Sequence, residues 1–207
     1  TQFVWLARFA LASLKMHLTS LCAAAIKLLR IAKSIDKRCW WFNSPLRQFT
    51  GEFPDNVFKA LESRGYGTYD MTLSLLEMDA KEVGGLAHFQ KGAKSIIKHV
   101  KYFPHLEISC VVQPVTRAVL KFSVTLVGNF DWNAGWLGSA QGFWLWIEDG
   151  VNERIYHQEH VLLSRRNHGS PVELELMIPA FEPLPPQYYV RVISDTWVGV
   201  ESLLPVR

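Results

Sequence analysis

Hydrophobic and polar residues follow a helical period in the first part of the chain. Residues 18–41 contain neither Gly nor Pro, and residues 23–25 are three consecutive alanines, which favour helix. On a helix with 100° per residue, five basic side chains fall within an arc of about 140°, and most aliphatic side chains fall opposite them. We therefore expect the aliphatic face to pack into a core and the other face to present a row of cations. The cations are Lys27, Arg30, Lys33, Lys37 and Arg38, and the aliphatic residues include Leu28, Leu29, Ile31 and Ile35.

Residues 44–104 predict several short helices. A turn with two glycines follows the first of them at residues 64–67. We expect Asp70 to cap a helix that runs through Met78, and Asp79 to cap the next, with Glu82 as its capping-box partner. The last helix has an apolar side and ends before Pro104.

The period changes after Pro104. Apolar and polar residues alternate over several short runs, and Gly, Asn, Asp and Pro separate these runs. About seven such strands in about 100 residues are typical of an antiparallel sandwich of the immunoglobulin or fibronectin type. No pair of cysteines spans the region, which excludes the disulfide-linked antibody form.

Composition narrows the class of protein. With 49% hydrophobic and 20% charged residues, the chain is not a disordered one. The three cysteines contain no Cys-x-x-Cys motif, and we expect reduced thiols. Arg8 interrupts the apolar start, and no charge-free run approaches the roughly 20 residues of a membrane span, so we expect no membrane partner. Because the chain begins without Met and within a helical pattern, we expect it to be part of a larger protein.

Charge is distributed unevenly. Residues 1–50 hold eight basic residues and one acid, whereas residues 104–207 hold seven basic residues and eleven acids. One interpretation is that the basic end meets an anionic partner. The other is that the basic face complements the acidic C-terminal part of the same molecule.

Motifs for catalysis are missing from the sequence. It has no phosphate loop, no Gly-x-Gly-x-x-Gly and no Gly-x-Ser-x-Gly elbow. His157, Glu159 and His160 lie on one predicted strand, where alternation points His160 away from the other two, so they cannot share a metal ion. We expect no catalytic residue, metal site or cofactor site in this chain.

Several strings together resemble the Sec63 homology unit that follows the motor domains of large DExH-box helicases. The likeness covers about residues 20–205, in the order of the family. Within the family, the strings at 44–49 and 152–157 are most similar to the helicases of the activating signal cointegrator complex, and the spliceosomal helicases are nearly as similar. The strings include Ile-Asp-Lys-Arg-Cys-Trp at 35–40, Ser-Pro-Leu-Arg-Gln-Phe at 44–49, Gln-Pro-Val-Thr-Arg at 113–117, Glu-Pro-Leu-Pro-Pro-Gln-Tyr at 182–188 and Ser-Asp-Thr-Trp-Val-Gly-Val-Glu at 194–201.

The resemblance implies an α+β, multidomain architecture. Residues 1–43 would be the remnant of a helical bundle with a basic ratchet helix, 44–104 a small helix-loop-helix domain, and 105–207 an immunoglobulin-like β-sandwich. It also implies a non-catalytic accessory unit that guides a single strand of RNA or DNA past two RecA-like motor domains of the same polypeptide. ATP and magnesium would act in those motors, and the parent helicase would work with other subunits in the nucleus, or alternatively in the cytoplasm.

The basic helix gives this implication a physical basis. Cations at spacings of three and four can hold successive phosphates without reading sequence. We expect Lys27, Arg30, Lys33 and Lys37 to form this row, with Arg38 at its edge.

A second group of cations is expected at the start of the last short helix. Lys91 and Lys94 flank Gly92, where a helix N-terminus and a bare glycine would let a phosphate approach. The alternative is that these two lysines contact no phosphate and that this segment only packs within the protein. The alternative function for the whole chain is a protein-docking module of a helicase in a splicing, transcription-coactivator or ribosome-rescue complex.

Overall fold

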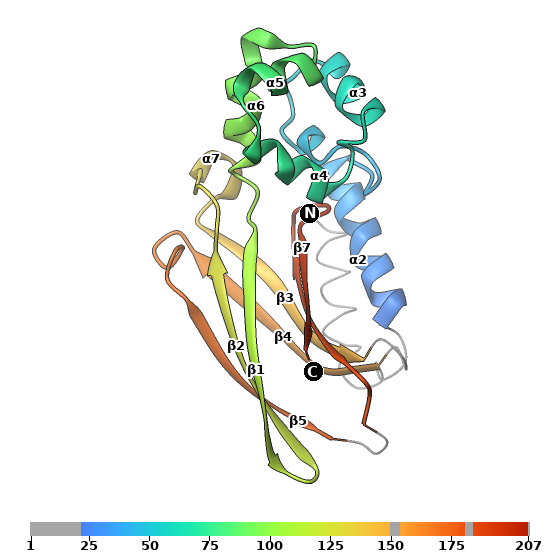
Figure 1. The fold of residues 1–207 in the computed structure, drawn as a ribbon, viewed down its shortest axis with the longest axis vertical. Helices are drawn as coiled ribbons and strands as arrows, with labels where there is room; N and C mark the ends of the chain where they lie inside the picture. The colour runs from blue at the N-terminus through green and yellow to red at the C-terminus, as the bar shows by residue number, and fades with distance from the viewer. Residues whose placement is uncertain (1–21, 150–153, 181–183, 207) are drawn as a thin grey trace.

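The computed structural model describes residues 22–149, 154–180 and 184–206, so the predicted first part is described only from Cys22 onward. A layer of short helices lies at one end of a β-sandwich, and one longer helix, α2, runs along the side of the molecule (Figure 1). The chain is therefore of the α+β class, as predicted. The helical elements are α2 (Cys22–Lys37), η2 (Pro45–Gln48), α3 (Asp55–Ser63), α4 (Tyr69–Leu73), η3 (Ser74–Glu77), α5 (Ala80–Leu86), η4 (Gln90–Gly92), α6 (Ala93–Val100) and α7 (Ala134–Leu137).

Helix α2 ends in a left-handed turn at a residue that is not glycine. Arg38 has φ 51°, and the backbone N–H of Cys39 donates to the carbonyl of Ser34 at 3.1 Å. This is the hydrogen bond of a Schellman ending, in which the left-handed position usually belongs to Gly. An Arg there costs roughly 1 kcal/mol or more of backbone strain, which the surrounding contacts must offset.

The short helices of 44–104 follow their capping signals with one exception. Asp79 caps α5, and the carboxylate of Glu82 accepts a hydrogen bond from the backbone N–H of Asp79 at 2.9 Å, which confirms the predicted capping box. The expected cap at Asp70 is wrong. Thr68 is the N-cap of α4, and Asp70 lies inside the first turn, where a carboxylate still favours the helix dipole.

Among the described residues after Pro104, seven antiparallel strands form two sheets. One sheet has the order β1-β2-β5 and the other the order β4-β3-β6-β7. The predicted alternation appears in β2, where Phe122, Val124 and Leu126 are buried between less buried neighbours. The strands are β1 (Leu106–Thr116), β2 (Val119–Gly128), β3 (Ala140–Asp149), β4 (Arg154–Ser164), β5 (Val172–Pro179), β6 (Tyr188–Ser194) and β7 (Glu201–Val206).

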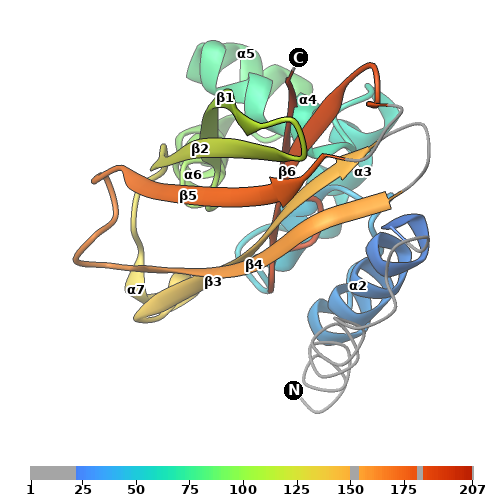
Figure 2. The ribbon, with the colours of Figure 1, turned by 90° about the horizontal axis from the view of Figure 1, so that it is seen from below.

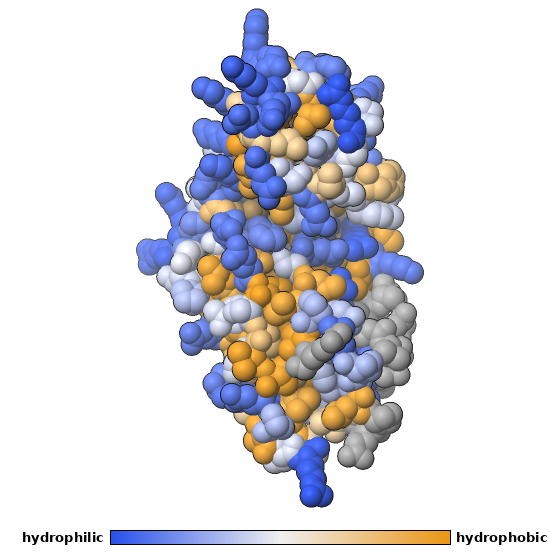
Figure 3. All heavy atoms as spheres, in the orientation of Figure 1, coloured by the Kyte–Doolittle hydropathy of each residue, from blue (hydrophilic) through white to orange (hydrophobic). Residues whose placement is uncertain are grey.

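One hydrophobic core joins the short helices to the sandwich. Phe49 of the helical layer contacts the ring of Trp197, with centroids 5.3 Å apart, and Phe103 contacts the same ring at 5.6 Å. Trp197 is 1% exposed, whereas Trp132 is only partly buried. Polar side chains dominate the surface of the helical layer, and apolar ones gather over the sandwich where β1, β2 and β7 lie (Figure 3).

Helix α2 packs on the outer face of the four-stranded sheet (Figure 2). Leu29 forms a second, small core with Trp144, Trp146 and Ile193 of that face. The two tryptophans alternate with Phe143, Leu145 and Ile147, which point into the sandwich core. The two tryptophans of β3 therefore pack against α2 and not between the two sheets.

The expected orientation of α2 is wrong. Leu28, Ile31 and Ile35, which we expected to enter a core, are 53%, 41% and 51% exposed. Leu29, Ala32 and Lys33 are buried instead. The helix has turned its cationic side partly toward the sheet, because Leu29 and the acidic sandwich lie on that side.

Gln48 connects the helical layer to the turn between β6 and β7. Its side-chain amide donates to the carbonyl of Val198 at 2.9 Å, and its side-chain oxygen accepts from the backbone N–H of Val198 at 2.8 Å. Gln48 is 4% exposed, so water cannot readily replace it.

We expect Gln48→Ala to lower the free energy of unfolding by about 2–4 kcal/mol, because two buried backbone groups of Val198 lose their partner. The matched control is Gln113→Ala, at an exposed glutamine of β1, which should change the same free energy by about 0.5 kcal/mol or less. Urea unfolding followed by circular dichroism measures both. Equal effects at the two positions would contradict the bridging role.

Candidate nucleic-acid interface

Lys33 lies inside the protein and does not belong to an exposed row of cations. Its side chain is 2% exposed, and its Nζ donates to the carbonyl oxygens of Ser194 and Trp197 at 2.9 and 3.0 Å. Burial lowers the pKa of Lys33 to about 8, against the attraction of Glu201. The expectation that Lys33 faces solvent on α2 is therefore wrong, because the turn after β6 supplies its hydrogen-bond acceptors.

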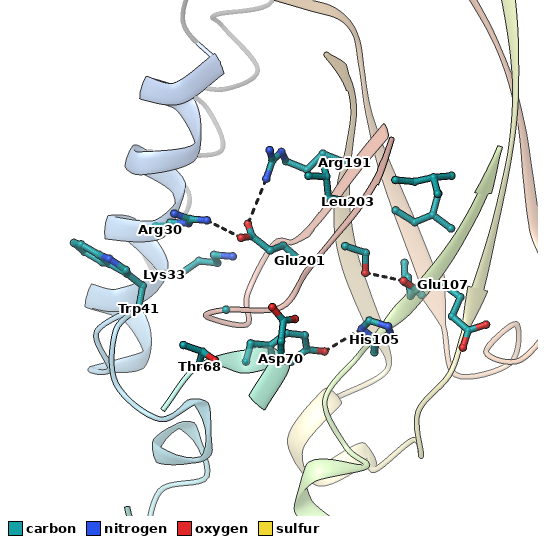
Figure 4. Close-up of a pocket in the computed structure, with 16 residues that line it drawn as sticks. Arg30, Lys33, Trp41, Thr68, Asp70, His105, Glu107, Arg191, Glu201 and Leu203 are labelled. Atoms are coloured by element: carbon teal, nitrogen blue, oxygen red, sulfur yellow. Dashed lines mark hydrogen bonds and ion pairs between the residues drawn. The ribbon is translucent and has the colours of Figure 1, made fainter. Parts of the chain in front are cut away.

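Arg30 belongs to a chain of ion pairs across the outer face of the sheet (Figure 4). Its Nη2 lies 2.6 Å from Oε1 of Glu201 on β7, and the other carboxylate oxygen of Glu201 lies 4.0 Å from Arg191 on β6. Arg191 in turn donates twice to Glu148 of β3, at 2.9 and 2.7 Å. Arg30 therefore links α2 to three strands of the sandwich.

Lys37 completes the contact between α2 and the turn. Its Nζ lies 4.7 Å from the centre of the Trp197 ring, within the range of a cation–π interaction. Partial burial lowers the pKa of Lys37. Three of the four cations predicted for the strand-binding row thus have partners within the chain, and only Lys27 and the edge residue Arg38 are classed as exposed.

A cleft of about 790 Å³ opens between α2, α4, β1 and β7 (Figure 4). Charges along it are balanced, so it offers a polyanion no net attraction. The interpretation that the basic helix complements the acidic C-terminal part agrees with this geometry. The ionisable lining residues are Arg30, Lys33 and Arg191 on the basic side, and Asp70, Glu107 and Glu201 on the acidic side, together with Tyr69 and His105.

The lysines around α6 are placed differently. Lys91 and Lys94 are exposed, and the opposite side of the helix buries Ile96 and Val100 in the core. Neither lysine forms an ion pair with a residue that the structure describes. These two predicted site residues therefore remain available to an external anion.

Two lysines that the sequence analysis missed extend this group. Lys98 and Lys101 are exposed, and with Lys94 they fall within an arc of about 60° on a helix of 100° per residue, while the exposed Lys91 lies in η4 just before α6. The spacing of three, four and three residues is visible in the sequence and could have revealed them. We name Lys91, Lys94, Lys98 and Lys101 the α6 lysine face.

Gly92 has a structural role in this site. The residue is buried, and a side chain there would collide with the ring of Phe89, which packs over the glycine. The expectation that the bare glycine admits a phosphate is wrong, because an aromatic ring already occupies that space. An anion would meet the lysine side chains and not the backbone at Gly92.

No group of three or more His, Cys, Asp or Glu side chains in the part of the chain that the structure describes could hold a metal ion. His157 lies 3.6 Å from Glu159, whereas His160 pairs with Asp195 at 3.2 Å, so the two histidines serve different partners. Among the described helices, none is long and apolar enough to span a membrane.

We expect Lys33→Met to change how the free energy of unfolding depends on pH. The folded chain gives up the lysine proton at a pH of about 8, whereas the ordinary value is 10.5. Between these values the unfolded chain binds more protons, so the stability contributed by this site rises with pH, by roughly 3 kcal/mol in full. The Met variant has no such proton and should lack this rise.

Urea unfolding at about pH 7 and about pH 10.5 measures the difference between the two proteins. Burial raises the pKa of Cys39 and of Cys110 to about 11, which lowers stability over the same range, but both proteins share these thiols. Lys27→Met removes an exposed ammonium from the same helix and should keep the rise. A Lys33→Met protein that also keeps it would show that the ammonium of Lys33 is not buried.

Comparison with known proteins places the chain in a family. The profile of the Sec63 Brl domain matches residues 7–207. The U5 small nuclear ribonucleoprotein 200 kDa helicase of Drosophila melanogaster is 40% identical over 182 residues, which cover 88% of this chain and 8% of that protein. The RQC trigger complex helicase SLH1 of Saccharomyces cerevisiae is 37% identical over 175 residues, which cover 84% of this chain and 9% of that protein.

A plant relative gives the same result. The DExH-box ATP-dependent RNA helicase DExH14 of Arabidopsis thaliana is 36% identical over 186 residues, or 89% of this chain and 8% of that protein. The chain thus spans less than a tenth of the length of each of these relatives. The chain belongs to the Sec63 family, as a unit of the kind that large DExH-box helicases carry.

Proposed function

We propose that this chain is a non-catalytic accessory unit of an ATP-dependent helicase and that it guides a single nucleic-acid strand past the motor domains. Membership of the Sec63 family supports the accessory role, since the similar proteins named above are helicases. The observation that carries the guiding role is the α6 lysine face, whose four exposed lysines run from η4 along α6 to its C-cap.

The chemistry of this face suits a strand of any sequence. Lysine is a flexible point charge, and phosphate contacts made by such charges carry no sequence information. Lys94 and Lys101 are seven residues apart, about 10 Å along an α-helix, which is long enough to meet more than one phosphate, and Lys91 extends the row into η4. The sandwich, with its excess of acids, repels the same strand and leaves the helical layer as the place of contact.

Helix α2 has a divided role in this proposal. Lys27 is exposed and can join the phosphate contacts, with Arg38 at the other end of the helix. Arg30, Lys33 and Lys37 instead fix the helix on the sheet through Glu201, the carbonyls of Ser194 and Trp197, and the Trp197 ring. We therefore assign strand contact to Lys27, Lys91 and Lys94, extended by Lys98 and Lys101.

In our proposal, the motor domains and the other subunits of the helicase complex lie outside this chain. ATP and magnesium act in RecA-like motor domains of the same polypeptide, which is also the first partner of this unit. Further subunits bind the parent helicase in the nucleus, where a U5 small nuclear ribonucleoprotein would work, or in the cytoplasm. The strand can be RNA or DNA, since lysine–phosphate contacts do not require a 2′-hydroxyl.

A second candidate function is that of a protein-docking module. The observation that favours it is the inward use of Arg30, Lys33 and Lys37, which removes most of the predicted strand-binding row from α2. In that case the lysines around α6 would only keep the helical layer soluble.

The two functions differ in how binding depends on salt. Each lysine–phosphate contact contributes about 0.7 to the slope of log affinity against log salt for a single strand. We therefore expect Lys91→Gln with Lys94→Gln to weaken binding of a labelled single-stranded RNA and to lower that slope by about 1.4. Fluorescence anisotropy at a series of KCl concentrations measures both quantities.

The control variant is Lys59→Gln with Lys121→Gln. It removes the same net charge, but both lysines already pair with carboxylates, Lys59 with Asp55 and Lys121 with Glu175. This variant should keep the slope. If the two double variants lose affinity and slope equally, only net charge matters, and the docking function is the better one.

A further inference from the structure

The two sheets of the sandwich do not join where β1 lies beside β7. β1 is an edge strand of the three-stranded sheet, and β7 is an edge strand of the four-stranded sheet. The two strands contact each other, but among the described residues no backbone hydrogen bond joins them. The hydroxyl of Ser202 instead donates to the carbonyl of Leu106 at 2.7 Å, at the end next to the helical layer. We name the line between these two edges the β1–β7 seam.

The cleft beside α2 opens on this seam (Figure 4). Four consecutive residues at the start of each strand line it, 105–108 and 201–204. Because side chains alternate across a strand, an unbroken run of lining residues means that the strand edge itself borders the cleft. Pro114 and Pro205, which cannot donate to a ladder, lie outside these runs. The backbone groups that point away from the neighbouring strand can therefore pair with an added strand.

Apolar side chains lie on both faces of the seam. Ile108 and Leu204 pack against the core of the sandwich but are only partly buried, because no ladder closes the sheets over them. Leu203 lies on the opposite face of β7 and is 47% exposed. The side chains of an added strand alternate in the same way, so such a strand would make apolar contacts on both of its faces.

The basic residues of the cleft already have partners within the chain. Arg30 and Arg191 both face the carboxylate of Glu201, at 2.6 and 4.0 Å. Lys33 is 2% exposed and donates to two carbonyl oxygens. These cations are therefore poorly placed to bind a further anion.

Two acids that line the same cleft are not neutralised in this way. Asp70 and Glu107 are exposed, and neither forms an ion pair with a residue that the structure describes. Glu107 accepts a hydrogen bond from the uncharged side-chain amide of Asn129, at 2.7 Å. Burial lowers the pKa of His105, which lines the cleft with them, so its imidazole is neutral at neutral pH and does not balance their charge. The cleft therefore attracts a cationic side chain.

The sign of this charge decides between the classes of partner. Asp70 and Glu107 repel phosphates, which does not suit a nucleic acid. A second copy of this chain in a two-fold interface would bring the same acids together. A protein segment that carries Lys or Arg between apolar residues complements both the acids and the apolar side chains of the seam.

We propose that the β1–β7 seam binds an extended segment of another protein, which pairs its backbone with the strand edges and places a Lys or Arg side chain beside Asp70 and Glu107. Backbone pairing would supply affinity, and the basic and apolar side chains would supply specificity. This inference does not depend on strand guiding, since none of its residues is among the lysines assigned to the strand.

Selection of a random library of ten-residue peptides, displayed on phage, against the purified full-length polypeptide tests the inference. We expect the enriched peptides to share a Lys or Arg flanked by apolar residues. An enriched peptide labelled with fluorescein is then titrated against the same polypeptide by fluorescence anisotropy. Asp70→Asn with Glu107→Gln should weaken its binding about tenfold, because two attractions to the basic side chain are lost.

Matched controls separate the seam from the rest of the surface. Glu77→Gln with Glu173→Gln removes the same net charge at exposed acids outside the cleft and should keep the affinity. Leu203→Lys should weaken binding, whereas Met177→Lys, at a residue of β5 that is 53% exposed, should not. The same peptide with N-methylated backbone amides should not bind, because it cannot donate to a strand edge.

Several outcomes would overturn the proposal. They are a lack of enriched peptides, equal losses of affinity in the two double variants, and full binding of the N-methylated peptide. Displacement of the peptide by single-stranded RNA would assign the cleft to the strand instead, and a dimer in light scattering that Leu203→Lys separates would assign the seam to a second copy. The peptide and RNA measurements use the unaltered polypeptide, so they do not depend on how a variant folds. The salt slope of the α6 lysines reports on strand guiding independently.

Discussion

The turn between β6 and β7 holds the three parts of this molecule together. It offers the carbonyls of Ser194 and Trp197 to the buried ammonium of Lys33 on α2. It also pairs both backbone groups of Val198 with Gln48, and it packs the Trp197 ring against the rings of Phe49 and Phe103. Gly199, at φ +82°, brings the turn so close to Tyr69 that a side chain at Gly199 would be strained and crowded. Helix, helical layer and sandwich are therefore positioned by one short segment of chain.

This constraint decides which side of α2 faces the sheet. Burying an ammonium group without hydrogen-bond partners costs a large amount of free energy. Helix α2 must therefore lie where the Nζ of Lys33 reaches the carbonyl oxygens of the turn. Once Lys33 is fixed, Arg30 falls beside Glu201, and Lys37 falls over Trp197. Leu29 then meets Trp144 and Trp146, and Leu28, Ile31 and Ile35 are left on the opposite side. The exposed apolar stripe is thus a consequence of satisfying one buried charge.

Local signals in the sequence predicted local structure well and the packing of α2 badly. The capping box at Asp79 and the alternation in β2 depend on neighbours in the chain, and both are present. The helical period of α2 also predicted a helix, but a helical wheel assumes that cations face water. The acceptors of Lys33 lie 161 and 164 positions away, and no periodicity reports a contact of that kind. In the same way the wheel could have revealed Lys98 and Lys101, whereas only the structure shows that Phe89 covers Gly92.

Charge is therefore used in two physically different ways in this chain. Lys33 of α2 sits at low dielectric against two fixed carbonyl oxygens, where its interactions are strong and little affected by salt, and Arg30 beside it pairs with Glu201. The lysines around α6 are exposed to water, where the attraction between one ammonium group and a phosphate is weak. Their effect on binding comes from several such contacts together and from the counterions that a nucleic acid releases. Only the second kind can hold a moving strand, because a contact that must break at every step has to be weak and replaceable. In the proposed function, the exposed lysines would grip the mobile polyanion, while the buried and paired cations of α2 keep the unit that presents them rigid.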